Sequence, residues 1–538
     1  MKMASIPVFY ALLWVSFSWI LYKGVSLLYI RRQHAIKSRK LDCEPAPLWP
    51  ATNLGISTIK QMMAAQKAGR FPAYLREREE VLSKSENRPV HTMRLSILGN
   101  KAHFTSDPKN IQALLATQFK DFGLGSARIG NFGPLMGDGI FASDGKRWEH
   151  SRALLRPQFA RDNISDLDLE EVHVQNMMQA LPVDADGWVS ETNAQLLFFR
   201  LTLDSSTEFL FGESIDTQLA AIRGGEAGAA AAAWRDERVF GTAIDSSQGY
   251  LFKGARFGNY YWMAHDKQFK KLCKDVHNFA DYYVEKALNA ETSEKRAPSP
   301  TRKFVFLEEL AAQTRDPIEL RTQLLNILIA GRDTTACLLS WMLLLLAKNP
   351  EVFEKLREIV IHDFGNYENP RDISFTSLKD CQYLQHCLNE ALRVYPVVPM
   401  DGRRALVDTT IPRGGGADGL SPIFIPKGTD VSYSVYVMHR RKDIWGEDAD
   451  EFKPSRWTSK RPGWDYLPFN GGPRICIGQQ FALTEASYVM VRLLQRFDKI
   501  EPTGPTLDAE PKMRLTLTCC PADGVWVKMR QAKDVASH

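Results

Sequence analysis

The chain has 538 residues, of which 44% are hydrophobic and 24% are charged, and its formal net charge is +5. This is the composition of a globular protein that is long enough to bury a cofactor, and the charge is too small to predict nucleic-acid binding. The eight cysteines include no Cys-x-x-Cys pair and no disulfide-like spacing. In a chain of this size, that pattern predicts a reducing compartment.

The chain begins with an apolar segment. Residues 6–22 carry no charge, and residues 24–30 are apolar again after Lys23, whose side chain can snorkel to a membrane interface. Five basic residues follow at once: Arg31, Arg32, Lys37, Arg39 and Lys40. The positive flank predicts an uncleaved transmembrane anchor over residues 1–30, with the rest of the chain in the cytosol. The competing interpretation is a cleaved signal peptide, but no small-residue cleavage site follows the apolar run.

A proline-containing stretch separates the anchor from the rest of the chain. Residues 44–50, Glu-Pro-Ala-Pro-Leu-Trp-Pro, predict a stiff hinge, so residues 31–50 are interpreted as a basic flank and hinge. No further linker or repeat is found, and residues 51–538 are predicted to form one domain. Within it, residues 224–233 predict a surface insertion or an alanine-rich helix start, and residues 291–302 predict a polar loop.

The hydrophobic pattern predicts a mostly helical chain with minor sheet. The longest predicted helix covers residues 317–348, because Asp316 is a good N-cap, a proline follows it, and Glu319 completes a capping-box-like pattern. At 1.5 Å per residue, such a helix is about 50 Å long and crosses the whole body. Short strands are predicted at residues 90–98, 429–437 and 515–527, the last with an Asp523-Gly524 turn.

The interior of the long helix contains Ala-Gly-Arg-Asp-Thr-Thr at residues 330–335. Glycine and threonine are poor helix formers, so another requirement must favour them. A threonine hydroxyl such as that of Thr334 can open the backbone ladder and hold water, and the carboxylate of Asp333 can relay protons to that water. Gly331 leaves room for a diatomic ligand. The alternative interpretation is an ordinary Ser/Thr kink.

The most specific pattern is Phe-Asn-Gly-Gly-Pro-Arg-Ile-Cys-Ile-Gly at residues 469–478. Cys476 has the setting of a thiolate that ligates a haem iron. Gly472 and Gly478 let the backbone approach a flat macrocycle, and Phe469 can shield the sulfur from water. A helix predicted after the loop would point its N-terminus at the thiolate and stabilise the negative charge. The alternative interpretation is a buried core cysteine beside a glycine-rich turn.

The pattern Phe-x-x-Gly-x-Arg-x-Cys-x-Gly resembles the haem-binding loop of the cytochrome P-450 superfamily, the haem-thiolate monooxygenases. Residues 330–335 resemble the oxygen-activation segment of the same family. The resemblance implies the P-450 fold, with haem between the long central helix and the cysteine loop. It makes Cys476 the axial ligand of the iron, and Arg474 can reach a haem propionate. It places Asp333 and Thr334 in proton delivery.

Two further motifs of the family concern the propionates. Trp148 and Arg152 match the Trp-x-x-x-Arg motif that grips haem propionates, for which a guanidinium group offers a fork of donors. Arg403 stands where the family has a second propionate-binding arginine, although Arg404 beside it leaves an offset of one residue open.

A third motif implies structural support. Glu390 and Arg393 match the family's Glu-x-x-Arg pair, which an arginine from a later loop locks, here Arg456. The resemblance gives these residues the role of supporting the haem loop, not of catalysis. Three basic residues lie around the Trp-x-x-x-Arg motif: Lys146, Arg147 and Arg156. These residues are explained equally well as a surface that meets an acidic electron donor and as the solvated basic face of a helix.

Four segments of the sequence resemble the fungal alkane- and fatty-acid-hydroxylating P-450 family more closely: residues 330–336, 409–416, 431–440 and 469–483. What this implies is terminal or near-terminal hydroxylation of a long aliphatic, hydrophobic substrate with dioxygen. The implied partners are an NADPH-dependent cytochrome reductase, with cytochrome b5 as an optional second donor. The implied location is the endoplasmic reticulum membrane, as a single-pass protein with its catalytic domain facing the cytosol.

Some residues depart from that family. Arg441 stands where an aspartate is usual, and the residues around Arg403 differ, which suits an enzyme that tailors an aliphatic polyketide or another secondary metabolite. Two other classes remain as alternatives: a haem-thiolate isomerase or peroxygenase, and a haem-binding sensor. Neither class has a reason to keep the pair Asp333 and Thr334.

Overall fold

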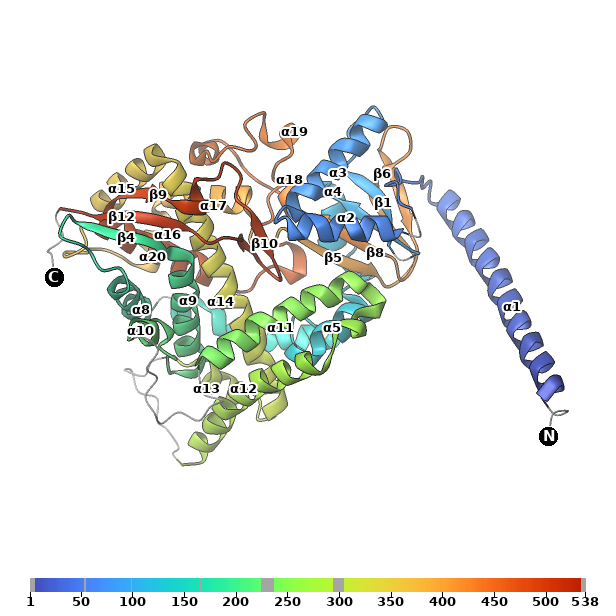
Figure 1. Cartoon of the computed structure of the whole chain (residues 1–538), viewed down its shortest axis with the longest axis horizontal. Coiled ribbons are helices and arrows are strands. Elements are labelled where there is room, and N and C mark those ends of the chain that lie inside the picture. The colour runs from blue at the N-terminus through green and yellow to red at the C-terminus, as the bar shows by residue number, and fades with distance from the viewer. Residues whose placement is uncertain are drawn as a thin grey trace.

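The computed structural model describes residues 5–52, 55–97, 99–164, 166–223, 237–293 and 304–533. Most of these residues are helical, and the strands among them form four small sheets (Figure 1). The predicted fold class, mainly α with small β-sheets, is confirmed.

The helices are α1 (Ser5–Lys40), α2 (Ile56–Lys67), α3 (Phe71–Ser85), α4 (Pro108–Gln112), α5 (Gly125–Met136), α6 (Gly145–Leu155), α7 (Arg161–Ile164), α8 (Asp168–Gln179), α9 (Ala194–Phe211), α10 (Thr217–Ile222), α11 (Glu237–Phe257), α12 (Lys267–Ser293), α13 (Phe306–Ala311), α14 (Pro317–Lys348), α15 (Pro350–Phe364), α16 (Phe375–Asp380), α17 (Gln382–Val394), α18 (Val435–Met438), α19 (Lys442–Trp445) and α20 (Gln479–Arg496). The strands are β1 (Thr92–Ile97), β2 (Asn100–Thr105), β3 (Phe122–Gly123), β4 (Trp188–Asn193), β5 (Met400–Ala405), β6 (Thr409–Gly415), β7 (Ser421–Ile425), β8 (Asp430–Ser434), β9 (Phe497–Pro502), β10 (Met513–Leu515), β11 (Cys519–Pro521) and β12 (Trp526–Gln531).

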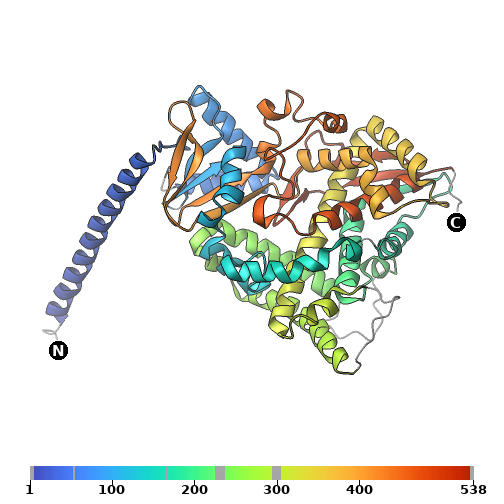
Figure 2. The same ribbon diagram turned by 180° about the vertical axis from the view of Figure 1, so that it is seen from behind.

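Helix α1 projects away from the globular body in both views (Figures 1 and 2). It continues beyond the apolar segment to Lys40, because lysine and arginine are good helix formers. The helix is long and apolar enough to cross a membrane, and none of its apolar stretch is buried against the protein. Helix α14 is also long and apolar enough, but 83% of its apolar stretch is buried, as expected of a core helix.

The proline-containing segment 44–50 is held against the body. The Glu44 N–H donates a hydrogen bond to the Pro422 carbonyl at 2.9 Å, and the Trp49 N–H donates to the Arg94 carbonyl at 2.9 Å. These bonds join the base of α1 to two of the sheets.

Helix α14 forms the centre of the core. It covers Pro317–Lys348, as predicted, and the Asp316 carboxylate accepts hydrogen bonds from two N–H groups of the first turn, at 2.9 and 3.4 Å. The predicted capping box is not formed, because the Glu319 carboxylate bonds to Thr314 and His150. One cap is sufficient here, since packing supplies most of the stability of a helix in a protein.

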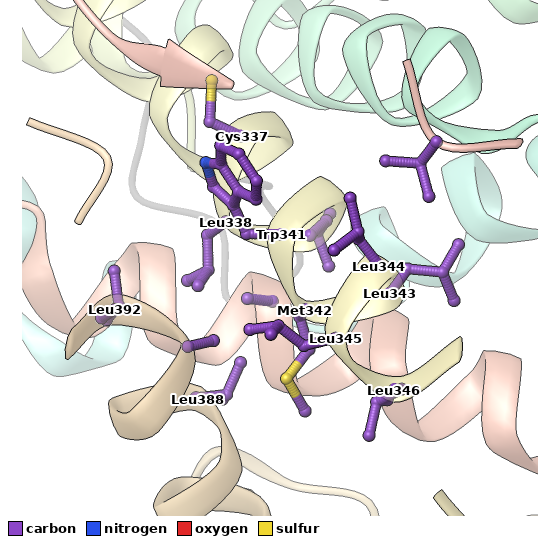
Figure 3. Packing of buried hydrophobic residues seen from close by; sticks show 14 of the residues in the cluster. Cys337, Leu338, Trp341, Met342, Leu343, Leu344, Leu345, Leu346, Leu388 and Leu392 are labelled. Atoms are coloured by element: carbon purple, nitrogen blue, oxygen red, sulfur yellow. The ribbon is translucent and has the colours of Figure 1, made fainter. Parts of the chain in front are cut away.

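The C-terminal half of α14 packs on α17. Figure 3 shows Leu338, Met342 and Leu345 beside Leu388 and Leu392, and all five side chains are buried. Because both helices contribute apolar residues at helical spacing, the packing fixes the rotation of α14 about its axis.

The five-stranded sheet, with order β1-β2-β8-β5-β3, positions Arg403. Strands β5 and β8 pair antiparallel, with Arg403 opposite Val431. Because side chains alternate along a strand, Arg403 and Arg404 lie on opposite faces. Arg403 is buried, whereas Arg404 pairs with Asp430 at 2.6 Å near the surface.

The strand predictions were partly wrong. Strand β1 lies within the predicted 90–98, but the predicted 429–437 ends as a strand at Ser434. The Ser434 hydroxyl accepts a hydrogen bond from the Val437 N–H at 3.2 Å and starts helix α18. The predicted 515–527 is divided among β10, β11 and β12, and β11 and β12 belong to different sheets, so no hairpin joins them.

Two stretches that were predicted to lie on the surface fall largely outside the residues that the structure describes. Residues 224–233 and 294–302 lie outside the described residues. Helix α12 continues to Ser293, three residues into the predicted polar loop, so the start of that loop was placed too early.

Candidate active site

The cysteine loop is a tight turn that leads into α20. The Cys476 N–H donates a hydrogen bond to the Phe469 carbonyl at 3.0 Å. Helix α20 begins directly after Gly478, as predicted, and the Gly478 N–H lies close enough to the Cys476 thiol to lower its pKa. The N-terminus of a helix therefore lies beside the sulfur, where its dipole favours a negative charge.

The surroundings of the Cys476 thiol act on its charge in both directions. Cys476 has an exposed surface, yet burial among protein atoms is the largest influence on the thiol and raises its pKa. The Gly478 N–H and the positive charge of Arg152 act in the other direction and lower the pKa. A stable thiolate requires such donors and charges.

Helix α14 also has a small accessible face. From Leu320 to Ala347 every residue is buried with four exceptions: Arg321, Ala330, Gly331 and Thr334. The last three share one face of the helix, because residues four apart lie one above the other. The accessible face therefore coincides with the segment in which the sequence predicted room for a diatomic ligand.

Asp333 and Thr334 have different neighbours. The Thr334 hydroxyl donates to the Ala330 carbonyl at 2.6 Å, which keeps its oxygen available as an acceptor. The buried Asp333 carboxylate accepts from Gln248 of α11 at 2.5 Å and lies 3.3 Å from the Arg332 guanidinium. Burial raises the pKa of Asp333. No hydrogen bond joins Asp333 to Thr334 in the described part of the chain, so the predicted relay needs an intermediate water molecule or a rotation of Asp333.

Two of the predicted arginines meet at Trp148. The Arg474 guanidinium lies 4.4 Å from the centre of the indole ring, and that of Arg152 lies 5.9 Å from it. Arg474 also donates to Asp144 at 2.7 Å. Burial lowers the pKa of Arg474 to about 10 and also lowers that of Arg152. Both charges thus lie in partly dry surroundings, where an anion binds them more strongly than in water.

The third predicted arginine belongs to a network that sequence reasoning missed. The Asp401 carboxylate binds Arg403 at 2.7 Å and Arg128 of α5 at 2.5 Å. Burial opposes the charge of Asp401, but the two guanidinium groups outweigh burial and hold its pKa well below its usual range. The Nε atoms of both arginines are buried and have no hydrogen-bond partner among the described residues. Arg128 belongs to no motif, and only the fold connects it to the site.

The Glu390–Arg393 pair is fully buried. Arg393 donates two hydrogen bonds of 2.9 Å to Glu390, and Arg456 contacts the same carboxylate at 3.3 Å. The predicted three-residue arrangement is confirmed, and the Trp457 indole N–H adds a bond of 2.9 Å. Arg393 also donates to three backbone carbonyls within residues 439–451, at 2.6 to 2.9 Å. The pair therefore fixes the chain that leads to the cysteine loop.

The family model for cytochrome P-450 matches residues 69–522. The chain belongs to the cytochrome P-450 family. It is 50% identical over 526 residues to cytochrome P-450 monooxygenase g430 of Fusarium sp, covering 96% of this chain and 90% of that protein. It is 45% identical over 505 residues to cytochrome P-450 52A6 of Candida tropicalis, with 92% and 93% covered. It is 43% identical over 517 residues to cytochrome P-450 monooxygenase alt2 of Alternaria solani, with 92% of each chain covered.

As a cytochrome P-450 monooxygenase, the chain is an oxidoreductase that incorporates one oxygen atom from dioxygen, and the family binds haem through an axial cysteine thiolate. P-450 enzymes take electrons from a redox partner and bind hydrophobic substrates. The site fits a haem on two observations. The Cys476 side chain is accessible, and the unpartnered Nε donors of Arg128 and Arg403 suit carboxylate groups. The apolar helix α1 agrees with a membrane-anchored P-450.

Gly472 marks a place where the P-450 cysteine loop has no room for a side chain. Its φ is +69°, and an added Cβ would lie 1.9 Å from the Leu115 carbonyl oxygen. We expect Gly472→Ala to lower the haem content and to lower the free energy of unfolding by more than ~1 kcal/mol, measured by absorbance and urea titration. Gly249→Ala in α11 is the control, because no atom lies within 4 Å of its added Cβ. Equal haem content in the two variants would contradict the expectation.

Proposed function

We propose that this chain is a membrane-anchored haem-thiolate monooxygenase that hydroxylates a long aliphatic substrate, an alkane or a fatty acid, at or near its end. The observation that carries the proposal is a pair of accessible surfaces. One is the Cys476 thiol, and the other is the face of α14 formed by Ala330, Gly331 and Thr334. A thiolate and an oxygen-handling hydroxyl are the groups that this chemistry requires.

In this proposal the Cys476 thiolate would hold the haem iron, and Phe469 and Gly478 shape the loop around the sulfur. Bound haem supplies the redox-active iron at which dioxygen is reduced. The Gly478 N–H and the Arg152 charge stabilise the thiolate, and the tight turn at Gly472 brings the backbone close to the macrocycle.

The propionates of the haem are assigned to four side chains: Trp148, Arg152, Arg403 and Arg474. Carboxylates hold two of these guanidinium groups in place. Asp401 binds Arg403, and Asp144 binds Arg474. An arginine that is already oriented loses little entropy when it binds a propionate.

Proton delivery is assigned to Thr334 and Asp333. The Thr334 oxygen can still accept a hydrogen bond and would hold a water molecule, and Gly331 leaves space beside it. Asp333 is the carboxyl group that would exchange protons with that water, and it is oriented by the Gln248 amide and by Arg332, which also pairs with the exposed Asp245 at 2.6 Å. Its raised pKa lets the carboxyl carry a proton at a higher pH than an exposed aspartate does.

The partners and location follow from the anchor and the reaction. Helix α1 crosses the endoplasmic reticulum membrane once and leaves the catalytic domain in the cytosol, because five basic residues follow its apolar stretch. Electrons come from a membrane-bound NADPH-dependent cytochrome reductase, with cytochrome b5 as a second donor. The substrate class rests on the resemblance of residues 330–336, 409–416, 431–440 and 469–483 to the fungal alkane- and fatty-acid-hydroxylating P-450 family.

The test is a hydroxylation assay in microsomes that contain the chain and a reductase. With dodecane or lauric acid we expect NADPH-dependent oxygen uptake and a product hydroxylated at or near the chain end, identified by mass spectrometry. Oxygen uptake that neither substrate stimulates, with no hydroxylated product, would refute the substrate class.

Thr334→Ala is expected to uncouple the reaction. Without the hydroxyl no water molecule is held beside residue 334, so electrons from NADPH appear as hydrogen peroxide in place of hydroxylated product. We expect the rate of product formation to fall by roughly 10²-fold while NADPH oxidation continues. The ratio of peroxide to product measures the effect. Thr334→Ser keeps the hydroxyl and is expected to stay coupled; equal uncoupling of both variants would contradict the role.

Removal of residues 2–30 is expected to release the protein from the membrane. The apolar stretch of α1 makes no contact that buries it, so the globular body should fold without it. We expect the full chain to stay in the pellet after a carbonate wash and the shortened chain to move to the supernatant with its haem bound. A shortened chain that stays firmly in the pellet would show that the anchor lies elsewhere.

A second candidate is favoured by the departures around Arg403 and Arg441. Asp401 joins Arg403 to Arg128, and Arg441 pairs with Asp443 at 2.6 Å. These residues suit an enzyme that tailors an aliphatic polyketide or another secondary metabolite. Comparison of the metabolites of a deletion strain and its parent separates the candidates, because a tailoring enzyme leaves an unoxidised precursor.

A further inference from the structure

Two buried thiols that the proposed mechanism does not use meet beside α14. Cys337 of α14 is 0% exposed and Cys520 of β11 is 3% exposed, and both are free cysteines. The two side chains lie close enough for each to act on the charge of the other. Figure 3 shows the Cys337 sulfur on the side of α14 away from Leu388 and Leu392 of α17, beside a strand. Cysteines that approach each other this closely can be joined by a disulfide.

Contacts between α14 and β11 hold the two thiols together. The Cys337 thiol lies 3.6 Å from the Thr518 hydroxyl oxygen, just before β11. The Trp341 indole N–H, one turn further along α14, donates a hydrogen bond of 2.9 Å to the Cys519 carbonyl. Because successive side chains of a strand point to opposite faces, Cys519 and Cys520 cannot both face α14. Cys520 is therefore the partner of Cys337, and Cys519 is a natural control.

Hydrogen-bond donors surround the sulfur of Cys520. Arg514 of β10 stands opposite Cys520 in the antiparallel strand pair, and the Gln195 amide of α9 donates to the sulfur at 3.9 Å. The contact with Cys337, which is the largest cause, and then the charge of Arg514 lower the pKa of Cys520. Together they outweigh burial and the negative charge of Asp333. A thiolate, and not a thiol, is the form of cysteine that attacks an oxidant.

Cys337 has the opposite tendency. Burial, the largest cause, raises the pKa of Cys337 well above its usual range, and the neighbouring Cys520 raises it further. The pair therefore consists of one sulfur that favours the thiolate and one that remains a thiol. A redox-active cysteine pair has this division between an attacking sulfur and a resolving sulfur.

The protein surface reaches the pair at Arg514. This side chain is exposed, although Cys520 opposite it is buried, and the two groups lie close enough for Cys520 to raise the pKa of Arg514. A small polar oxidant that reaches the guanidinium group is thus next to the sulfur. Hydrogen peroxide fits this description, since it is small and accepts hydrogen bonds from such donors.

We propose that Cys520 and Cys337 are a peroxide-sensitive site that forms a disulfide between β11 and α14. The Cys520 thiolate attacks one oxygen of hydrogen peroxide, the O–O bond breaks, hydroxide leaves, and Cys520 becomes a sulfenic acid. Cys337 then attacks the Cys520 sulfur and releases its own proton, so that the S–S bond forms, the S–O bond breaks and water leaves. In sum, two thiols and one hydrogen peroxide give one disulfide and two water molecules.

The disulfide would restrain α14 beside the proposed proton-delivery segment. Cys337 follows Thr334 by three residues, so the two lie on neighbouring positions of the helix surface. We expect the oxidised protein to hydroxylate more slowly and a thiol reductant to restore the rate, so that peroxide from uncoupled turnover limits further turnover. This consequence rests on the proposed monooxygenase function; the formation of the disulfide does not.

The first test is mass spectrometry of the haem-containing full chain after a small excess of hydrogen peroxide. The remaining thiols are alkylated, and the protein is digested without a reductant. We expect a cross-linked peptide that contains Cys337 and Cys520 and has lost the mass of two hydrogen atoms. The cross-link should persist in the control Cys519→Ala and disappear in Cys520→Ala and Cys337→Ala. A wild-type protein without the cross-link, or a cross-link that survives in Cys520→Ala, would overturn the proposal.

The second test separates an activated thiolate from two thiols that are merely close. Arg514→Gln changes an exposed residue and leaves both cysteines in place, and we expect the cross-link to form about tenfold more slowly, the factor for one lost hydrogen bond to a charged group. Lys528→Gln is the control, because it removes one positive charge from an exposed position of β12, which belongs to another sheet. Equal rates in the two variants would overturn the proposal. The cross-link is measured without turnover, so a failed hydroxylation assay would refute the proposed function and leave this result standing.

Discussion

Cys476→Ser is expected to abolish the red-shifted Soret band of the reduced, carbon-monoxide-treated protein, and hydroxylation with it. A serine hydroxyl has almost the size of the thiol, but it does not ionise beside the Gly478 N–H and the Arg152 charge as a thiol does. Burial already raises the pKa of the thiol, so binding of the iron must drive its deprotonation. An oxygen ligand that stays protonated cannot supply the electron density that a thiolate supplies.

The control for this prediction is Cys43→Ser. Cys43 is a free cysteine that lies half-buried after α1, far along the chain from the haem loop. We expect this variant to keep the thiolate spectrum and the activity. A red-shifted band that survives in Cys476→Ser, together with normal haem content, would assign the ligand to another residue and remove the basis of the proposed function.

The features that could be predicted from the sequence are those that contiguous residues determine. Helix α14 needs only its N-cap, its proline and an unbroken apolar pattern, and its observed bounds agree with the prediction. The cysteine loop closes through a bond between Cys476 and Phe469, seven residues apart, so its turn is also local. The Glu390–Arg393 pair is also local, with its members three residues apart on one helix, but it was recognised through its resemblance to the family's Glu-x-x-Arg motif.

The features that were missed depend on residues that are distant in the sequence. Arg128 joins Asp401 across 273 positions, and no spacing rule connects α5 to β5. Ser205 and Glu485 are 280 positions apart, and their hydrogen bond forms only because the fold brings α9 and α20 together. Within its own helix Glu485 is an ordinary polar residue. Its pKa is raised because the fold buries it, and the sequence of the helix does not show this burial.

Local rules also compete, and tertiary contacts decide between them. The run Val-Tyr-Val at residues 435–437 favours a strand by composition, but the Ser434 hydroxyl caps a helical turn there. Glu319 stands at the right position for a capping box, yet His150 of α6 and Thr314 take its carboxylate. In both places a polar side chain found a partner that composition alone does not reveal.

Arg393→Met is expected to give the largest loss of stability among single substitutions outside the haem loop. Methionine fills a similar volume but leaves the Glu390 carboxylate 0% exposed and without its main counter-charge. Removal of one partner from a buried ion pair costs about 3–5 kcal/mol. Arg393 also donates to three backbone carbonyls within residues 439–451, so these lose their donors as well. We expect a lower midpoint of urea unfolding and loss of haem at lower urea concentration.

The size of this effect separates a buried pair from a surface pair. Arg70→Met removes an arginine that lies 2.6 Å from Glu77, but both side chains are about half exposed, 55% and 47%, and such pairs are worth ~0–1 kcal/mol. The double variant Arg393→Met with Glu390→Gln removes the stranded charge and is expected to recover part of the loss, because the two residues act as one unit. If Arg393→Met were no more costly than Arg70→Met, then Arg456 and Trp457 would suffice to neutralise Glu390, and the cysteine loop would not depend on the pair. We expect the opposite, since Arg456 divides its charge between Glu390 at 3.3 Å and Asp448 at 2.8 Å.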